Sequence, residues 1–192
     1  MERLIVARHG ESEYSARRAL NGDPALACPL TDAGRAQARR LGQLLAHEQI
    51  DLCVTSEFER TRETADLALA GRHVPRVVVP ELNDHPAGDY EGRPLDEYLV
   101  WAHAHGSREP VPGAAESRLD TAARVARGFR LLLEGPETTV LAVLHSLPIS
   151  YLLGGPEQRL PLLAYAEPHL LDREAAERAV ERLERWCAAP SW

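Results

Sequence analysis

Arg8 and His9 place a guanidinium next to an imidazole, directly after the apolar run of residues 4–7. Such a run predicts a strand that is buried on both faces. Because buried charge is costly, we expect the pair at the exposed carboxyl end of that strand, where open α/β sheets bind their ligands. Arginine binds phosphate and carboxylate with paired hydrogen bonds, and histidine changes charge near neutral pH. The pair therefore indicates a site for an anion.

Polar residues that could bind an anion or transfer a proton follow three further apolar runs. In chain order they are Ser56 with Arg60, then Glu81 with Asp84, then His145. Each of them alone is more often an ordinary surface or core residue. Their coincidence at corresponding strand ends favours one shared pocket.

The elements that must position these residues alternate along the chain. The predicted strands cover residues 4–7, 51–55, 77–79 and 139–144, and the predicted helices cover 31–49, 56–70, 94–104, 119–133 and 172–187. Ser56 and Glu59 have the spacing of a capping box, which predicts the start of a helix. The alternation is typical of an α/β layered fold. Regularity weakens between residues 81 and 116, which we interpret as a lid or specificity region.

Composition excludes several classes of function. A chain of 192 residues with 44% apolar content is long enough for one domain with a full core. The net charge of −7 argues against a nucleic-acid or membrane-surface partner, because those partners are polyanions. All 22 basic residues are arginines, so a P-loop and Schiff-base chemistry are excluded, since both need a lysine.

The cysteines and the hydropathy of the sequence indicate in which cellular compartment the protein works. Cys28, Cys53 and Cys187 are an odd number without the spacing of a metal site, which indicates a reducing environment. The sequence has no pattern of a secretory signal, and no apolar stretch is long enough to span a bilayer. We expect a soluble, cytoplasmic protein.

Five motifs in one order carry a resemblance to a known family. They are residues 6–12 (VARHGES), 21–23 with 29–34, 56–61 (SEFERT), 81–84 with 88–92, and 143–146 (VLHS). In these motifs the chain resembles the histidine phosphatases, also called the phosphoglycerate mutase-like superfamily. The resemblance covers most of the chain. It implies a single domain over residues 1–192, built as a three-layer sandwich with helices on both faces of a mostly parallel sheet.

The resemblance also implies roles for the catalytic residues. His9 would attack phosphorus and form a phosphohistidine, so that covalent catalysis divides the displacement into two steps. Arg8 and Arg60 would bind the phosphoryl oxygens, and His145 would add a hydrogen-bond donor. Asp84 would protonate the leaving alkoxide and later accept a proton from water. No metal and no cofactor is implied.

Further residues of the motifs are expected to bind substrate. They are Gly10, Glu11, Ser15, Asn21, Gly22, Ser56, Glu81 and Ser146. Asp84 stands where the family usually has glutamate, and Glu81 is the alternative proton donor. Ser15 replaces the usual asparagine and Ser146 the usual glycine, which loosens any inference about the substrate.

Three alternatives remain open at this stage. The stretch between Asp84 and His145 is too short for the insertion typical of the mutases, which favours a phosphatase for a small phosphorylated metabolite over mutase-type phosphoryl transfer. A regulatory module that binds phosphate with weak turnover is a second alternative. In the third, His9, His145, Asp84 and Glu11 bind a catalytic metal, although the adjacent arginines would repel the cation. A monomer and a homodimer are equally compatible with the sequence.

Overall fold

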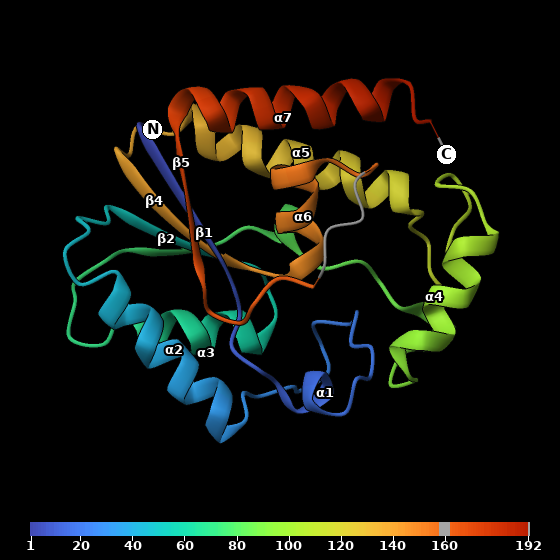
Figure 1. Ribbon diagram of the computed structural model, residues 1–192, viewed down its shortest axis with the longest axis horizontal. Coiled ribbons are helices and arrows are strands. Elements are labelled where there is room, and N and C mark those ends of the chain that lie inside the picture. The colour runs from blue at the N-terminus through green and yellow to red at the C-terminus, as the bar shows by residue number, and fades with distance from the viewer. Residues whose placement is uncertain (158–161, 192) are drawn as a thin grey trace.

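A mixed sheet forms the middle layer of the molecule (Figure 1). In the computed structural model, which describes residues 1–157 and 162–191, the sheet has five strands in the order β3-β2-β4-β1-β5. They are β1 (Arg3–Arg8), β2 (Leu52–Thr55), β3 (Arg76–Val78), β4 (Thr139–Leu144) and β5 (Pro168–Asp172). The first four strands are parallel, and β5 is antiparallel to β1.

Helices cover both faces of this sheet (Figure 1). The α-helices are α1 (Glu13–Ala16), α2 (Asp32–Leu44), α3 (Glu59–Ala68), α4 (Leu95–Ala104), α5 (Arg118–Glu134), α6 (Ser146–Gly154) and α7 (Arg173–Ala188). Two short 3-10 helices are η1 (Pro80–Leu82) and η2 (Gly88–Tyr90). α5, α6 and α7 lie on one face, and α2 and α3 lie on the other. The predicted α/β class with a mostly parallel sheet is confirmed.

The central strand β1 contributes to both halves of the core. Leu4 and Val6 pack in the cluster that α5, α6 and α7 complete, whereas Ile5 and Ala7 pack in the cluster beneath α2 and α3. This alternation follows from the two-residue period of a strand. All four side chains are fully buried. Because β1 is packed from both sides, the residues that follow it are held firmly.

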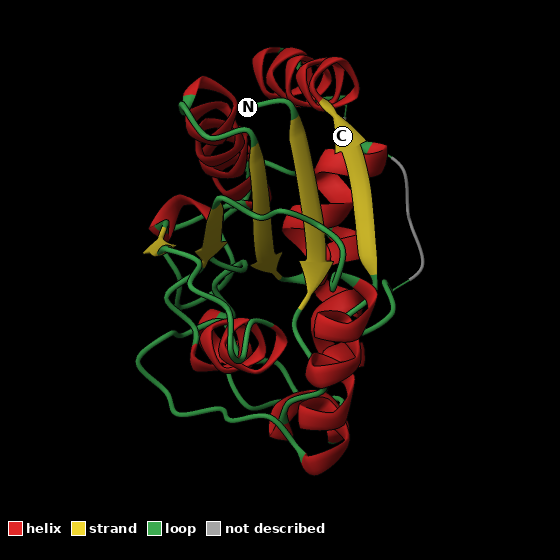
Figure 2. Ribbon diagram, turned by 90° about the vertical axis from the view of Figure 1, so that its left-hand side faces the viewer, coloured by secondary structure: helices red, strands yellow, loops and turns green. Residues whose placement is uncertain are grey.

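The carboxyl ends of the parallel strands meet at one edge of the sheet. Figure 2 shows loops and helices gathered beyond the arrowheads at this edge. The chain segment between residues 81 and 116, which includes η2 and α4, contributes to this region (Figure 1). Its role as a lid stays a prediction.

Several predicted boundaries are wrong. α3 begins at Glu59 with Phe58 as its N-cap and without a side-chain cap. The predicted capping box fails because the Ser56 hydroxyl bonds instead to His145, at 2.8 Å from Nε2. α2 ends at Leu44, before the predicted end at residue 49. β5 and α6 were not predicted.

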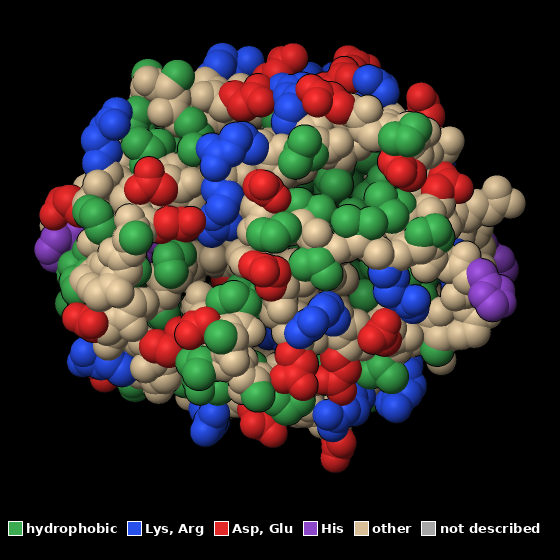
Figure 3. Space-filling view, turned by 180° about the vertical axis from the view of Figure 1, so that it is seen from behind, with side chains coloured by type: hydrophobic (Ala, Val, Ile, Leu, Met, Phe, Trp, Pro, Cys, Tyr) green, Lys and Arg blue, Asp and Glu red, His purple; other side chains and the backbone are tan. Residues whose placement is uncertain are grey.

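Charged side chains of both signs lie on the surface. On the face shown in Figure 3, arginine and carboxylate side chains are interspersed and do not form separate regions. Within the part of the chain that the structure describes, no helix has the length and apolar character needed to cross a membrane.

Candidate active site

Three parallel strands bring their following residues together. His9 follows β1, Ser56 follows β2, and His145 follows β4 as the N-cap of α6. The two histidine rings are 5.4 Å apart between centroids. The backbone N–H of His9 donates to the carbonyl of Leu144 at 2.9 Å, which continues the pairing of β1 with β4 into the site. The predicted convergence of strand ends is confirmed.

The hydrogen bonds of His9 fix its tautomer. Its Nδ1 lies 2.7 Å from the backbone oxygen of Gly10, which can only accept, so Nδ1 carries the proton. Nε2 therefore has a lone pair, which accepts from Nε of Arg60 at 3.1 Å. Burial, reinforced by the charges of Arg60 and Arg8, holds the pKa of His9 well below its ordinary value. The ring is neutral, with a nucleophilic nitrogen directed at a guanidinium.

Gly10 permits this close packing. A Cβ at this position would lie 2.5 Å from the backbone oxygen of Gly34, which is too close for any side chain. The N–H of Gly10 donates to the Thr64 hydroxyl at 3.0 Å. Gly10 thus joins the end of β1 to α2 and α3, and its carbonyl orients the His9 ring.

Arg60, in the first turn of α3, is the centre of the site. It is 4% exposed and donates to His9 through Nε and to Nδ1 of His145 through Nη2, each at 3.1 Å. Nη1 donates to the side-chain oxygen of Asn21, and Nη2 to the Asn21 backbone oxygen at 3.2 Å. One buried cation therefore faces the lone pairs of both histidines.

The Ser56 hydroxyl orients the His145 ring through a hydrogen bond. Because Nδ1 of His145 accepts from Arg60, its Nε2 carries the proton and donates to the Ser56 hydroxyl at 2.8 Å. Burial, followed by the charge of Arg60, lowers the pKa of His145 well below its ordinary value. Ser56 is fully buried. It therefore orients the His145 ring, and its contact with substrate stays a prediction.

Asp84 is the carboxylate nearest to the histidines. Its Oδ2 lies 3.5 Å from both Nη2 of Arg60 and Nδ1 of His145, and its Oδ1 accepts the N–H of His85 at 3.1 Å. Burial raises the pKa of Asp84, against the opposing charge of Arg60. Among residues 1–157 and 162–191, no other carboxylate lies this close to a histidine nitrogen. The role of Asp84 as proton donor, with Glu81 as the alternative, stays a prediction.

Arg8 reaches the site from the end of β1. Its Nη1 donates to the backbone oxygen of Leu163 at 2.7 Å, and its guanidinium lies 4.0 Å from the centroid of the Tyr165 ring. Its Nε is buried and has no hydrogen-bond partner in the described part of the chain. An unpaired buried donor is unusual, and this N–H is available to donate to an acceptor such as a phosphoryl oxygen. Tyr165 has no sequence signal that would have identified it.

The loop that holds Asn21 is fixed by Glu91. One carboxylate oxygen of Glu91 accepts from Nδ2 of Asn21 at 3.1 Å, and the other accepts from the N–H of Gly22 at 2.8 Å. A Cβ on Gly22 would lie 2.2 Å from the nitrogen of Ala87, so only glycine fits there. Glu91 belongs to the motif of residues 88–92, but we did not predict a role for it in the site.

The remaining predicted residues lie around these groups. The Glu11 carboxylate accepts from the Thr31 hydroxyl at 2.8 Å, at the N-cap of α2. Ser15 shares a hydrogen bond of 2.9 Å with Ser12, in α1. The Ser146 hydroxyl accepts from the N–H of Leu163 at 3.3 Å. Substrate binding by these three residues stays a prediction.

A catalytic metal does not fit the observed arrangement. The nitrogen lone pairs of His9 and His145 that a metal would need both face the Arg60 cation. Within residues 1–157 and 162–191, no three side chains of the ligating types form a group suited to a metal ion. The alternative that joined Glu11 to the histidines is therefore not supported.

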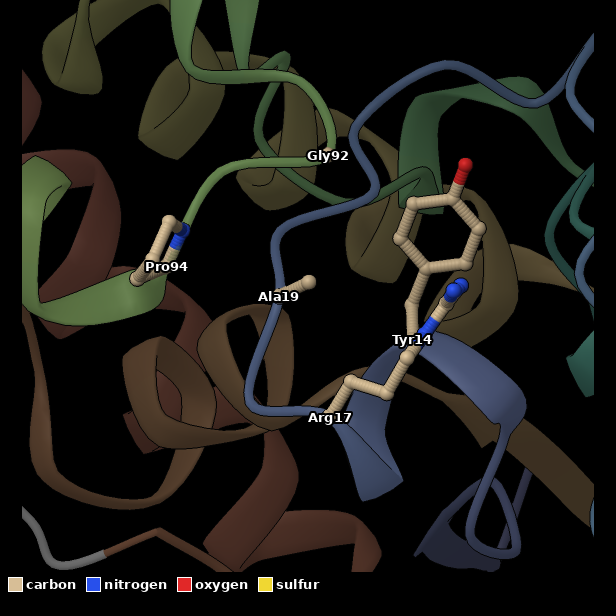
Figure 4. A pocket seen from close by; sticks show the side chains of 5 residues that line it. All are labelled: Tyr14, Arg17, Ala19, Gly92 and Pro94. Atoms are coloured by element: carbon tan, nitrogen blue, oxygen red, sulfur yellow. The ribbon is translucent and has the colours of Figure 1, made fainter.

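A separate hollow lies beside the loop of Asn21. Its volume is about 250 Å³, and it is lined by Tyr14, Arg17, Ala19, Gly92 and Pro94 (Figure 4). Ala19 and Pro94 pair across it as an isolated bridge. The hollow thus marks the contact of the α1 loop with residues 92–94, and it contains none of the predicted catalytic residues.

Comparisons with known proteins relate the chain to one family and to solved structures of the same fold. The family model for the histidine phosphatase superfamily (branch 1) matches residues 4–187. The adenosylcobalamin/alpha-ribazole phosphatase of Salmonella typhimurium is 44% identical over 119 residues, and this match spans 58% of each chain, less than two thirds of the relative's length. The Escherichia coli protein of the same name is 32% identical over 82% of each chain. The crystal structure of the alpha-ribazole phosphatase from Shigella flexneri has a TM-score of 0.73 at 29% identity, and covers 88% of this chain and 90% of that chain.

Proposed function

The chain belongs to the histidine phosphatase superfamily, and on that premise we propose that it hydrolyses phosphomonoesters through a phosphohistidine on His9. The observation that carries the proposal is the state of His9. Its Nε2 lone pair is held free of a proton beside the guanidinium of Arg60, and the Nε of Arg8 has no partner. A phosphoryl group placed there has a nucleophile and two cations.

In the first step, Nε2 of His9 forms a bond to phosphorus while the ester P–O bond breaks. Asp84 gives its proton to the departing oxygen, and burial raises the pKa of its carboxyl in the direction that this role needs. Arg60 exchanges its bond to His9 for one to a phosphoryl oxygen. In the second step, the Asp84 carboxylate accepts a proton from water, the water oxygen bonds to phosphorus, and the N–P bond breaks to release phosphate.

His145 has a role that depends on the bound anion. Its Nδ1 accepts from Arg60 in the free site, so it can donate to a phosphoryl oxygen only after taking up a proton. A phosphate dianion favours that protonation, because an adjacent negative charge raises a histidine's pKa. We therefore expect His145 to become a charged donor in the complex.

The proposed substrate is a small phosphorylated metabolite. The Salmonella and Escherichia coli relatives are named adenosylcobalamin/alpha-ribazole phosphatase, and a substrate with one phosphate suits the one nucleophile and two arginines of the proposed site. We further propose that catalysis needs no metal and that the enzyme works in the cytoplasm as a monomer or homodimer. Free thiols at Cys28, Cys53 and Cys187 are compatible with that compartment.

Release of inorganic phosphate from p-nitrophenyl phosphate and from a panel of alkyl phosphates tests the proposal, with His9→Ala as control. We expect turnover that survives exhaustive chelation and is lost in the variant. Transfer of the phosphoryl group to a second phosphoglycerate without release would show a mutase. Phosphate binding without turnover by the parent protein would show a regulatory module.

A further inference from the structure

Arg124, on α5, binds the backbone of the loop that carries Asp84. Its Nη1 donates to the carbonyl oxygens of Glu81 and Asn83, each at 2.9 Å, and its Nη2 donates to the carbonyl oxygen of Asp84 at 3.1 Å. Three carbonyls on one guanidinium fix the path of the chain from η1 to Asp84. A loop without regular secondary structure is thereby tied to a long helix.

Glu116 holds Arg124 in place. Its carboxylate accepts from Nε of Arg124 at 3.0 Å and from Nη2 at 2.9 Å, and it also accepts the Thr121 hydroxyl at 3.0 Å. With these bonds, Arg124 has a partner for each of its five N–H groups. Burial would raise the pKa of Glu116, but the hydrogen bonds and charge of Arg124 hold it below its ordinary value. The pair is a fixed ionic clamp.

The same clamp reaches the residue after Asp84. Because the Thr121 hydroxyl donates to Glu116, it must accept from Nδ1 of His85, which lies 2.6 Å away. The backbone N–H of His85 in turn donates to Oδ1 of Asp84 at 3.1 Å. Asp84 is thus held through its own carbonyl on one side and through the anchored His85 on the other.

We infer that Arg124 and Glu116 are positioning residues that keep the Asp84 carboxyl at 3.5 Å from Arg60 and His145, where it can deliver its proton. The inference rests on the proposed phosphatase function. The inference separates delivery of the proton from binding of the phosphate. In the described structure, Arg124 and Glu116 have no contact with Arg8, Arg60 or His9, the proposed phosphate ligands and nucleophile. Loosening the clamp should therefore impair proton transfer more than phosphate binding.

Leaving groups of different basicity distinguish the two effects. An alkoxide needs a proton to depart, whereas p-nitrophenolate departs readily without one. Hydrolysis of the phosphohistidine is common to both substrates, so kcat/KM, which reports only the steps through phosphoryl transfer to His9, would be measured for both in Arg124→Met and Glu116→Gln. We expect kcat/KM for an alkyl phosphate to fall by at least about tenfold more than kcat/KM for p-nitrophenyl phosphate, as a partial loss of general acid catalysis. Inhibition by inorganic phosphate should be unchanged. Arg124→Lys, with three donors, should recover part of the alkyl phosphate rate.

Arg130→Met is the matched control. Arg130 is also on α5 and forms a two-pronged pair with Glu184 of α7, at 3.0 and 2.6 Å, so its loss removes an equivalent clamp away from Asp84. This variant should lower kcat/KM for both substrates equally or not at all. If Arg124→Met fails to fold in a thermal melt, Glu116→Gln, which keeps the size of the side chain, provides the test.

Equal losses on both substrates in the Arg124 and Glu116 variants would overturn the inference, and so would unchanged rates on both. A parent protein that fails to hydrolyse p-nitrophenyl phosphate would overturn the proposed function instead. The two failures are therefore distinguishable.

Discussion

A single guanidinium determines the state of both histidines. Arg60 donates to His9 and His145 at 3.1 Å each, and burial together with its charge lowers the pKa of both rings. From the sequence, we expected only that His9, like any histidine, changes charge near neutral pH. In the folded chain its hydrogen bonds leave Nε2 without a proton and its pKa is held well below the ordinary value, so the nucleophile needs no separate base.

Substitution of the two candidate acids tests the assignment of Asp84. Asp84→Ala should lower kcat on an alkyl phosphate by about 10²- to 10⁴-fold, because it removes the general acid and base. Glu81→Ala should stay near the parent rate, since the contact of Glu81 with the clamp is through its backbone oxygen. Steady-state kinetics at neutral pH measure both. The assignment is wrong if the Glu81 variant alone loses turnover.

The five residues that we propose for catalysis could be identified in the sequence because their motifs are local. The role of Ser56 was not, because it depends on the distance between the ends of β2 and β4, which are far apart in the chain. The same reason hides Tyr165 and Arg124. Their importance follows from long-range packing and not from their neighbours in the sequence.

At the scale of elements, the sequence predicted the parallel strands but missed β5, α6 and the short helices α1, η1 and η2. α6 has apolar residues on all sides and a proline in its first turn, so it lacks the periodic pattern of a surface helix. β5 is a five-residue edge strand that begins with Pro168. Both elements adjoin the site, since His145 caps α6 and Leu163 lies between α6 and β5.

The contact between the Asn21 loop and Glu91 leads to a prediction about KM, in contrast to the prediction about turnover made for Asp84. Glu91→Gln replaces one of the two acceptor oxygens by an NH2 group, which cannot accept from the N–H of Gly22 or Asn21. The loop then holds Arg60 less firmly, and KM should rise on the order of tenfold for p-nitrophenyl and alkyl phosphates alike. Michaelis constants for both substrates provide the measurement.

Glu97→Gln serves as the control for this change, because Glu97 forms only an exposed pair with Arg93 in the described structure. Its KM values should match the parent. An effect of Glu91→Gln on the alkyl phosphate alone would contradict the account, since it would place Glu91 with the proton donor.

At the scale of the whole molecule, three buried neutral histidines tie stability to pH. Burial lowers the pKa values of His9, His85 and His145, and that of His85 to about 4. The unfolded chain binds these protons near pH 6.5, before the folded chain does. Stability is therefore complete above about pH 6.5 and is lost as the pH falls toward 4.

The change attributable to His85 alone is about 3 kcal/mol in the free energy of unfolding between these limits. Urea titrations at several pH values would compare the parent with His85→Gln. The variant should lose less stability on acidification than the parent. Parallel pH profiles for the two proteins would show that His85 does not carry the proton linkage.

The central claim is that the reaction passes through a phosphohistidine on His9. The direct measurement is to mix the Asp84→Ala protein with p-nitrophenyl phosphate, quench in alkali, and locate the phosphoryl group by mass spectrometry. Because this variant lacks the base for hydrolysis, we expect the intermediate to accumulate on His9 and to be absent in His9→Ala. A phosphoryl group on another residue, or undiminished turnover by His9→Ala, would contradict the account.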